Sequence, residues 1–168
     1  AFTDAELGTL KAEAAAATAR RLNPFVAAVP IAERIDAASA AHLVAEVDLV
    51  VDGTDDAATR LALHDAAWAR GIPYVWGTAV GTDGMVSVFW RDAPDGPVSL
   101  RDLHPDPLVD TGASCAVTGV AGPVTAAVGA MMAGEAMKLI AGYGVPLLGR
   151  VQVFDALDAT WTEVALAR

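Results

Sequence analysis

The middle of the chain, residues 49–56, reads Leu49-Val50-Val51-Asp52-Gly53-Thr54-Asp55-Asp56. An apolar, β-branched run that stops at turn residues is typical of a strand buried in a parallel sheet. The run therefore predicts a central strand over residues 49–51, and the turn after it leads into a predicted helix over 57–70. Ligands of open α/β sheets bind outside the carboxyl ends of the strands, so the acidic turn is a candidate ligand site.

Outward from this stretch, helix-like and strand-like segments alternate. Helices are predicted over residues 10–22, 37–46 and 117–141, and strands over 25–29, 74–78, 85–90, 149–154 and 161–166. Residues 91–114, rich in proline, glycine and acids, are predicted to form a long crossing loop. The β-α-β order indicates an α/β fold, with a Rossmann-like, mostly parallel sheet, helices on both of its faces and an antiparallel C-terminal part.

Composition narrows the classes of function. The chain has 168 residues, 54% of them hydrophobic, which suits one domain with a sizeable core. Its net charge of −10 excludes a diffuse nucleic-acid-binding surface as the main function. The single cysteine excludes an intrachain disulfide and agrees with a reducing, cytoplasmic location. The uncharged run 116–134 is long enough for a membrane span, but its alanine, glycine, threonine and proline content favours a core helix, so no membrane partner is expected.

The acidic turn after the central strand has two interpretations. Carboxylates at the end of a strand can hold Mg²⁺, which in turn bridges phosphate oxygens. Alternatively, Thr54, Asp55 or Asp56 caps the helix that follows and stabilises it by about 1 kcal/mol. The two roles can coexist, and the sequence leaves both open.

Two further residues are candidates for chemistry. Lys11 stands at the start of a predicted helix, where a positive charge opposes the helix dipole, so it either meets a phosphate or is an ordinary solvated lysine. Cys115 precedes the helix 117–141, whose N-terminal field favours the thiolate, so it is either a nucleophile or a small buried apolar residue. Arg60 and Asp65 are expected to be exposed charges on the helix 57–70, and the three histidines show no metal-ligand spacing.

Several motifs occur in the order that they have in one family of enzymes. They are Gly8-x-x-Lys11-Ala12 with Leu22-Asn23-Pro24, Val51-Asp52-Gly53-Thr54-Asp55-Asp56 with Arg60, Gly84-x-Val86-Ser87-Val88-Phe89, Ser114-Cys115-Ala116, Glu135-Ala136-x-Lys138, Tyr143-Gly144 with Gly149-Arg150, and Phe154-Asp155-Ala156-Leu157. Together they resemble the ThiF and ubiquitin-activating-enzyme-like family, which includes the molybdopterin-synthase and sulfur-carrier-protein adenylyltransferases. The resemblance covers nearly the whole chain.

The resemblance implies roles for particular residues. Lys11 is expected to contact the phosphates of ATP, and Asp55 to hold Mg²⁺. A nucleotide contact falls on Asp56, where the family has asparagine, and a cysteine that forms a covalent link with the carrier or with transferred sulfur in some relatives falls on Cys115. The implied reaction is ATP-dependent adenylylation of the C-terminal glycine of a ubiquitin-like sulfur-carrier protein that ends in Gly-Gly, carried out by a homodimer.

Two features of the family pattern are missing from the sequence. No G-x-G-x-x-G loop occurs, so the resemblance implies a single ThiF-type domain over residues 1–168 that is truncated at its N-terminus. The paired C-x-x-C motifs that hold structural zinc in many relatives are also missing, so no zinc is expected. The alternative to part of an enzyme is a non-catalytic binding or dimerisation module of the same fold. A nicotinamide-dependent oxidoreductase is disfavoured because the dinucleotide fingerprint is absent.

Overall fold

The computed structural model describes residues 3–104 and 119–166, which divide into one unit over residues 1–34 and a second over residues 35–168. The first unit contains the 3₁₀ helix η1 (Asp4–Glu6) and the helix α1 (Lys11–Leu22), which ends at Asn23. The strand predicted over residues 25–29 does not form. Its side chains Phe25 and Val29 are largely exposed, and the Ala28 carbonyl accepts a hydrogen bond from the Arg20 guanidinium instead of pairing with a strand.

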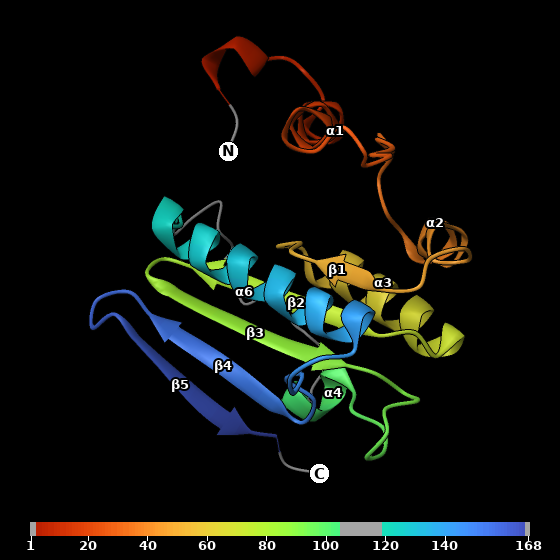
Figure 1. Cartoon of the computed structure of the whole chain (residues 1–168), viewed down its shortest axis with the longest axis vertical. Helices are drawn as coiled ribbons and strands as arrows, with labels where there is room; N and C mark the ends of the chain where they lie inside the picture. The colour runs from red at the N-terminus through yellow and green to blue at the C-terminus, as the bar shows by residue number, and fades with distance from the viewer. Residues whose placement is uncertain (1–2, 105–118, 167–168) are drawn as a thin grey trace. The chain divides into compact units, whose positions relative to one another are not determined.

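The second unit is built on a five-stranded mixed sheet with the order β1-β2-β3-β4-β5 (Figure 1). Its strands are β1 (Val50–Asp52), β2 (Tyr74–Val80), β3 (Asp83–Phe89), β4 (Arg150–Asp155) and β5 (Thr160–Ala165). Only β1 and β2 pair in parallel, whereas the three pairings from β2 to β5 are antiparallel. The α/β class is therefore confirmed, but the described sheet is mostly antiparallel, because short turns join β2 to β3 and β4 to β5.

The strand β1, which corresponds to the strand predicted over residues 49–51, lies at the edge of the described sheet and not at its centre. Within the described residues its only strand partner is β2. Val50 and Asp52 are buried, while the side chain between them, Val51, is 51% exposed. The sequence correctly predicts a strand here, but the central position is wrong for the sheet that these residues form.

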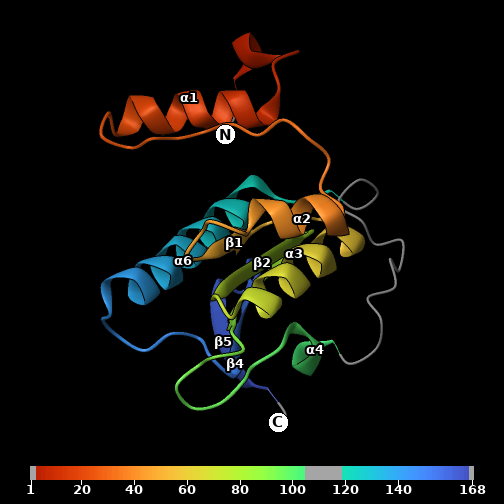
Figure 2. The same ribbon diagram turned by 90° about the vertical axis from the view of Figure 1, so that its right-hand side faces the viewer.

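Helices cover both faces of this sheet, as the sequence predicts (Figures 1 and 2). The helices α2 (Ala37–Leu43) and α3 (Ala57–Arg70) lie side by side on one face, over a core that includes Leu63, Tyr74 and Trp76. The helix α6 (Gly122–Ala141) crosses the other face, over β2 and β3. Because successive side chains of a strand point to opposite faces, the two strands contribute to both cores.

Two glycines let α6 come close to the sheet. A Cβ atom at Gly77 would collide with Met132, and one at Gly84 would collide with Val128. Among the described helices, α6 alone is long and apolar enough to cross a bilayer, a property that it shares with core helices of soluble proteins. It packs on the sheet through one face that includes Val128 and Met132, and the greater part of the helix stays uncovered.

The Glu135-Ala136-x-Lys138 motif has a structural role in α6. The Glu135 side chain is fully buried, and its Oε2 accepts a hydrogen bond from the Leu147 N–H at 2.8 Å. Its Oε1 lies 2.5 Å from the Lys138 ammonium, which also donates to the Val145 carbonyl at 3.2 Å. The motif therefore fixes the loop that leads from α6 into β4.

Candidate functional site

The acidic turn begins at Asp52, the last residue of β1, whose carboxylate is buried. Asp52 is 1% exposed, and its Oδ1 accepts a hydrogen bond from the Thr54 N–H at 2.8 Å. Its Oδ2 accepts a hydrogen bond from the Tyr74 hydroxyl on the neighbouring strand. Burial raises the pKa of Tyr74 well above its ordinary value, so this hydroxyl keeps its proton and remains a donor. Asp52 thus serves to shape the turn and is not available to a ligand.

The two carboxylates at the end of the turn have different environments. Asp56 is the N-cap of α3: its Oδ2 accepts hydrogen bonds from the Thr59 N–H at 2.8 Å and the Thr59 hydroxyl at 2.5 Å. Asp55 is exposed, and its side chain has no hydrogen-bond or ion-pair partner among the described residues. Of the three possible caps, the structure selects Asp56, and this leaves the Asp55 carboxylate free.

A free carboxylate at this place suits a magnesium ion that arrives with a nucleotide. Mg²⁺ is usually bound through one or two carboxylates, with substrate phosphates and water as its other ligands. In residues 3–104 and 119–166, no group of three or more His, Cys, Asp or Glu side chains is placed to hold a metal ion by itself. A site that took Mg²⁺ together with phosphate would have Asp55 as its exposed carboxylate ligand.

Arg60 is not the exposed helix charge that the sequence predicts. Its side chain is only 9% exposed, and its Nη2 donates a hydrogen bond to the Thr54 carbonyl at 2.6 Å. Its guanidinium carbon lies 5.5 Å from the centre of the Trp76 ring, within cation–π range. Asp56 and Arg60 are four residues apart, which places Arg60 one helical turn along on the same side of α3 as the cap.

His104 is a second neighbour that the sequence did not assign to this turn. It follows α4 (Leu100–Leu103), a short helix inside the predicted crossing loop, and its ring meets Trp76 edge-on with 6.0 Å between centroids. Burial, and the positive charge of Arg60, lower the pKa of His104 below its ordinary value. The imidazole is thereby kept neutral beside the buried guanidinium.

A clamp of three side chains joins α3 to α4. His64 is buried, and its Nε2 accepts a hydrogen bond from the Leu100 N–H at 3.2 Å, so Nδ1 carries the proton and donates to Asp65 Oδ1 at 3.0 Å. Arg101 donates hydrogen bonds to both carboxylate oxygens of Asp65, from Nη1 to Oδ1 at 2.6 Å and from Nη2 to Oδ2 at 3.0 Å. The hydrogen bond from Arg101 lowers the pKa of Asp65, and burial lowers the pKa of His64. Asp65 is exposed as predicted, but it is ion-paired.

The structure brings together only some of the residues proposed from the sequence. Asp55 and Asp56 share the turn after β1, as expected. Lys11 is the first residue of α1, also as expected, and is exposed, but it belongs to the first unit. Cys115 lies outside the described residues.

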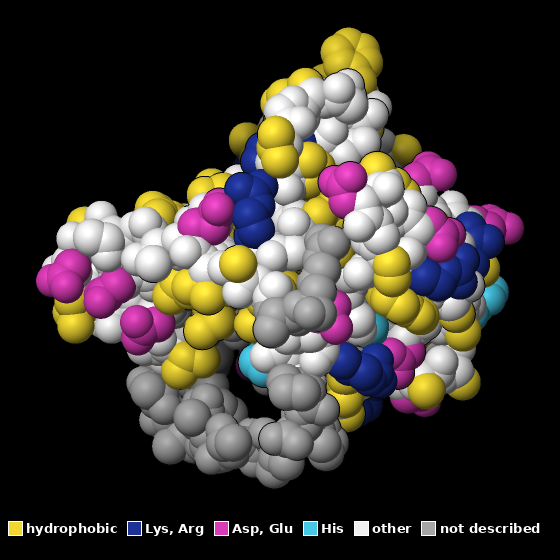
Figure 3. All heavy atoms as spheres, turned by 90° about the horizontal axis from the view of Figure 1, so that it is seen from below, with side chains coloured by type: hydrophobic (Ala, Val, Ile, Leu, Met, Phe, Trp, Pro, Cys, Tyr) yellow, Lys and Arg dark blue, Asp and Glu magenta, His cyan; other side chains and the backbone are white. Residues whose placement is uncertain are grey.

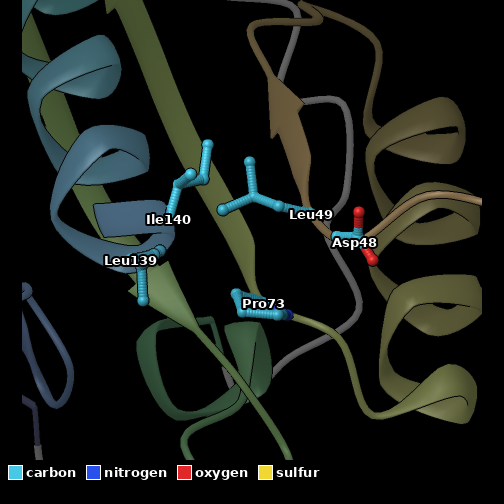
Figure 4. Close-up of a pocket in the computed structure, with 5 residues that line it drawn as sticks. All are labelled: Asp48, Leu49, Pro73, Leu139 and Ile140. Atoms are coloured by element: carbon cyan, nitrogen blue, oxygen red, sulfur yellow. The ribbon is translucent and has the colours of Figure 1, made fainter. Parts of the chain in front are cut away.

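A pocket of about 550 Å³ lies away from the acidic turn (Figure 4). It is lined by Asp48, Leu49, Pro73, Leu139 and Ile140. These residues are the two before β1, the one before β2 and two near the end of α6, so the pocket lies at the amino end of β1. Four of the five lining residues are apolar and Asp48 is the one acid, whereas the turn at the other end of the strand carries Asp55 and Asp56.

Positively and negatively charged side chains are interspersed on the face of the molecule shown in Figure 3. On the face shown in Figure 3, Lys and Arg side chains lie singly or in small groups next to Asp and Glu. On that face the described residues present no continuous basic patch, so an anion binding there would meet individual cations.

The fold and the site define an α/β domain with an acidic turn at the carboxyl end of a parallel strand. The chain belongs to the ThiF family, whose model matches residues 1–168.

Curated relatives extend this assignment along the whole chain. "Probable adenylyltransferase/sulfurtransferase MoeZ" of Mycobacterium tuberculosis is 41% identical over 169 residues, which is 98% of this chain and 42% of that protein. The "SAMP-activating enzyme E1" of Haloferax volcanii is 41% identical over 96% of this chain and 58% of its own length. "Molybdopterin-synthase adenylyltransferase" of Escherichia coli is 35% identical over 99% of this chain and 66% of its own length. The chain thus spans about two fifths to two thirds of these relatives.

Solved structures of low sequence identity share the fold. The crystal structure of E. coli MccB with ATP has a TM-score of 0.79 and is 18% identical, over 99% of this chain and 51% of MccB. MccB in complex with N-formylated MccA has a TM-score of 0.81 at 16% identity, over 99% of this chain and 52% of MccB. At these identities the likeness concerns the arrangement of the backbone.

Proposed function

We propose that the protein containing this chain is an ATP-dependent adenylyltransferase that activates the C-terminal glycine of a ubiquitin-like sulfur-carrier protein ending in Gly-Gly. The observation that carries the proposal is the free Asp55 carboxylate at the carboxyl end of β1, in a chain of the ThiF family. Relatives named as adenylyltransferases for molybdopterin synthase and for a sulfur carrier protein support it.

The proposed reaction is attack of the carrier's terminal carboxylate on the α-phosphate of ATP. The new bond joins the carboxylate oxygen to the α-phosphorus, and the bond to the bridging oxygen breaks, so pyrophosphate leaves and an acyl-adenylate remains. When bound, Mg²⁺ supplies positive charge that offsets the charge on the phosphates. In this scheme Asp55 orients that ion, the Lys11 ammonium contacts the phosphates and Asp56 contacts the nucleotide.

The experiment is a mass measurement on the carrier. The intact protein is incubated with ATP, Mg²⁺ and a carrier ending in Gly-Gly, and the carrier is examined for an added adenylyl group. We expect that group on the carrier with a free C-terminus and not on a carrier whose terminal carboxylate is an amide. An unmodified carrier under these conditions would leave the binding or dimerisation module as the better proposal.

We further propose that the protein is a cytoplasmic homodimer with α6 in its interface. Ala126 and Ala130 are exposed, and Gly134 has open space where a Cβ would be, so these small residues do not pack on the chain's own sheet. Small side chains allow a second backbone to approach closely, and apolar neighbours such as Met137 and Ile140 are 57% and 74% exposed.

For Cys115 we propose a part in the sulfur transfer that follows adenylylation. Formation of an acyl-phosphate uses no thiol, so Cys115→Ser in the intact protein should leave adenylylation unchanged and lower transfer of sulfur to the carrier. If both activities survive the substitution, Cys115 serves packing.

A further inference from the structure

The side chain of Arg60 is buried at the acidic turn, but no carboxylate in the described part of the chain is ion-paired with it. It is 91% buried, since 9% of it is exposed, and no Asp or Glu among residues 3–104 and 119–166 forms an ion pair with it. Asp52, the buried carboxylate at the start of this turn, accepts hydrogen bonds from the Thr54 N–H and the Tyr74 hydroxyl. Burial of an unpaired charge is unfavourable, so an anion from outside these residues is expected to meet it.

Three buried polar atoms around this guanidinium also lack partners. Among the described residues, Arg60 Nε, Thr54 Oγ1 and Trp76 Nε1 make no hydrogen bond. Arg60 contacts both of the other residues, because it donates to the Thr54 carbonyl and lies over the Trp76 ring. Native proteins rarely leave buried donors unpaired, and three such donors in one place need an explanation.

The position of these donors connects them with the proposed reaction. Thr54 directly precedes Asp55, and Trp76 of β2 pairs with Asp52, the last residue of β1, so the donors lie beside the turn at the carboxyl end of β1. Two N–H groups, one hydroxyl and one positive charge suit oxygens that bear negative charge. A neutral or cationic ligand would leave the charge uncompensated.

We propose that Arg60, together with Thr54 and Trp76, binds an anionic oxygen of the substrates, either a phosphate oxygen of the nucleotide or the terminal carboxylate of the carrier. This inference rests on the proposed function and adds to it a second cation, next to the turn that presents Asp55. Arg60 is retained in a buried position at a cost to stability because its charge serves the ligand.

The test compares Arg60→Met with Arg70→Met in the intact protein. Arg70 is an exposed arginine in the last turn of the same helix, so its substitution removes an equal charge without touching the turn. Binding is measured by calorimetry for ATP, for a carrier with a free C-terminus and for the same carrier with a C-terminal amide, and the melting temperature is recorded for each variant. Arg60→Lys, which keeps the charge but loses the planar fork, provides a second and milder substitution.

We expect Arg60→Met to weaken binding of ATP or of the free-carboxylate carrier about tenfold or more, with a melting temperature no lower than that of Arg70→Met. Loss confined to ATP assigns the site to a phosphate, and loss confined to the free carboxylate assigns it to the carrier's end. Wild-type affinities for both ligands, or a melting temperature that falls while affinities stay constant, would overturn the assignment. Wild-type protein that forms no acyl-adenylate would instead overturn the proposed function on which the assignment rests.

Discussion

At the scale of single residues, the acidic turn divides two roles between neighbouring carboxylates. Asp56 uses one oxygen to cap α3 through Thr59, whereas Asp55 has no partner within the described part of the chain. The sequence could not make this division, because either carboxylate is a reasonable cap. Only the backbone path after β1 decides which side chain turns toward the helix and which remains free.

The free carboxylate gives the first prediction. Asp55→Asn in the intact protein should lower the rate of adenylate formation about a hundredfold, because an amide is a poorer ligand for Mg²⁺. The melting temperature should stay at the wild-type value, since Asp55 is exposed. The matched control is Asp48→Asn, an exposed acid before the other end of β1, which should keep full activity. Equal rates for both variants would remove Asp55 from the site.

A second prediction concerns pH and the buried His64. Burial lowers the pKa of His64 below its ordinary value of 6.5, so the unfolded chain binds this proton more readily than the folded one. The free energy of unfolding is therefore highest above pH 6.5, where His64 is neutral in both states. It decreases as the pH falls toward the pKa that His64 has in the folded state. Melting temperatures between about pH 8 and pH 5 should show this loss for wild type and for His42→Ala, an exposed control. His64→Phe should reduce this loss, and His104, whose pKa burial also lowers, accounts for what remains. An unchanged pH dependence in that variant would assign the whole effect to another group.

At the scale of elements, α3 organises the site at both of its surfaces. Its first turn carries the cap and Arg60, which hold the turn after β1, and its middle carries His64 and Asp65, which hold α4. The end of α4 in turn brings His104 to Trp76. One helix therefore couples the acidic turn to α4 and His104.

The cap can be tested separately from the chemistry. Asp56→Ala removes the acceptor of the Thr59 N–H and should destabilise the protein by about 1 kcal/mol, a fall in melting temperature of roughly 2–4 °C. Asp56→Ser should restore most of the loss, because a serine hydroxyl also caps helices well. Thermal denaturation of the two variants measures the difference; equal melting temperatures for Asp56→Ala and wild type would show that the capping bond contributes nothing.

Most elements followed from the sequence, and the exceptions have physical causes. The predicted helix 57–70 matches α3, and the predicted hairpin matches β2 and β3, because periodicity and glycine stops are local signals. The segment 25–29 has a strand-like composition but no neighbouring strand in its unit, and strands need partners. The inward position of Arg60 depends on how α3 packs on β2, which a linear pattern does not encode.

At the scale of the whole molecule, this chain spans about two fifths to two thirds of the length of the curated relatives that it matches. The sequence has the ThiF motifs from Lys11 onward but no glycine-rich nucleotide loop. We therefore expect residues 1–168 alone to bind ATP weakly or not at all, and calorimetry on this polypeptide measures it. Tight binding would show that the loop is dispensable.

The dimer proposal belongs to the same scale. Light scattering of the intact protein at micromolar concentration should give twice the mass of one chain. Ala130→Glu should lower the measured mass toward that of the monomer, because a charge would be buried in the interface at α6. The control Glu46→Ala, at an exposed site on the second unit, should leave the dimer intact. A monomeric wild type would remove α6 from any dimer interface.

The most direct measurement of the central claim is exchange of labelled pyrophosphate into ATP by the intact protein, because only reversible formation of an acyl-adenylate returns pyrophosphate to the nucleotide. The result predicted here is exchange that requires Mg²⁺ and a carrier ending in Gly-Gly with a free carboxylate, and that is lost in Asp55→Asn. Exchange that proceeds without the carrier, or no exchange with the carrier present, would contradict adenylylation of a carrier C-terminus as the function of this protein.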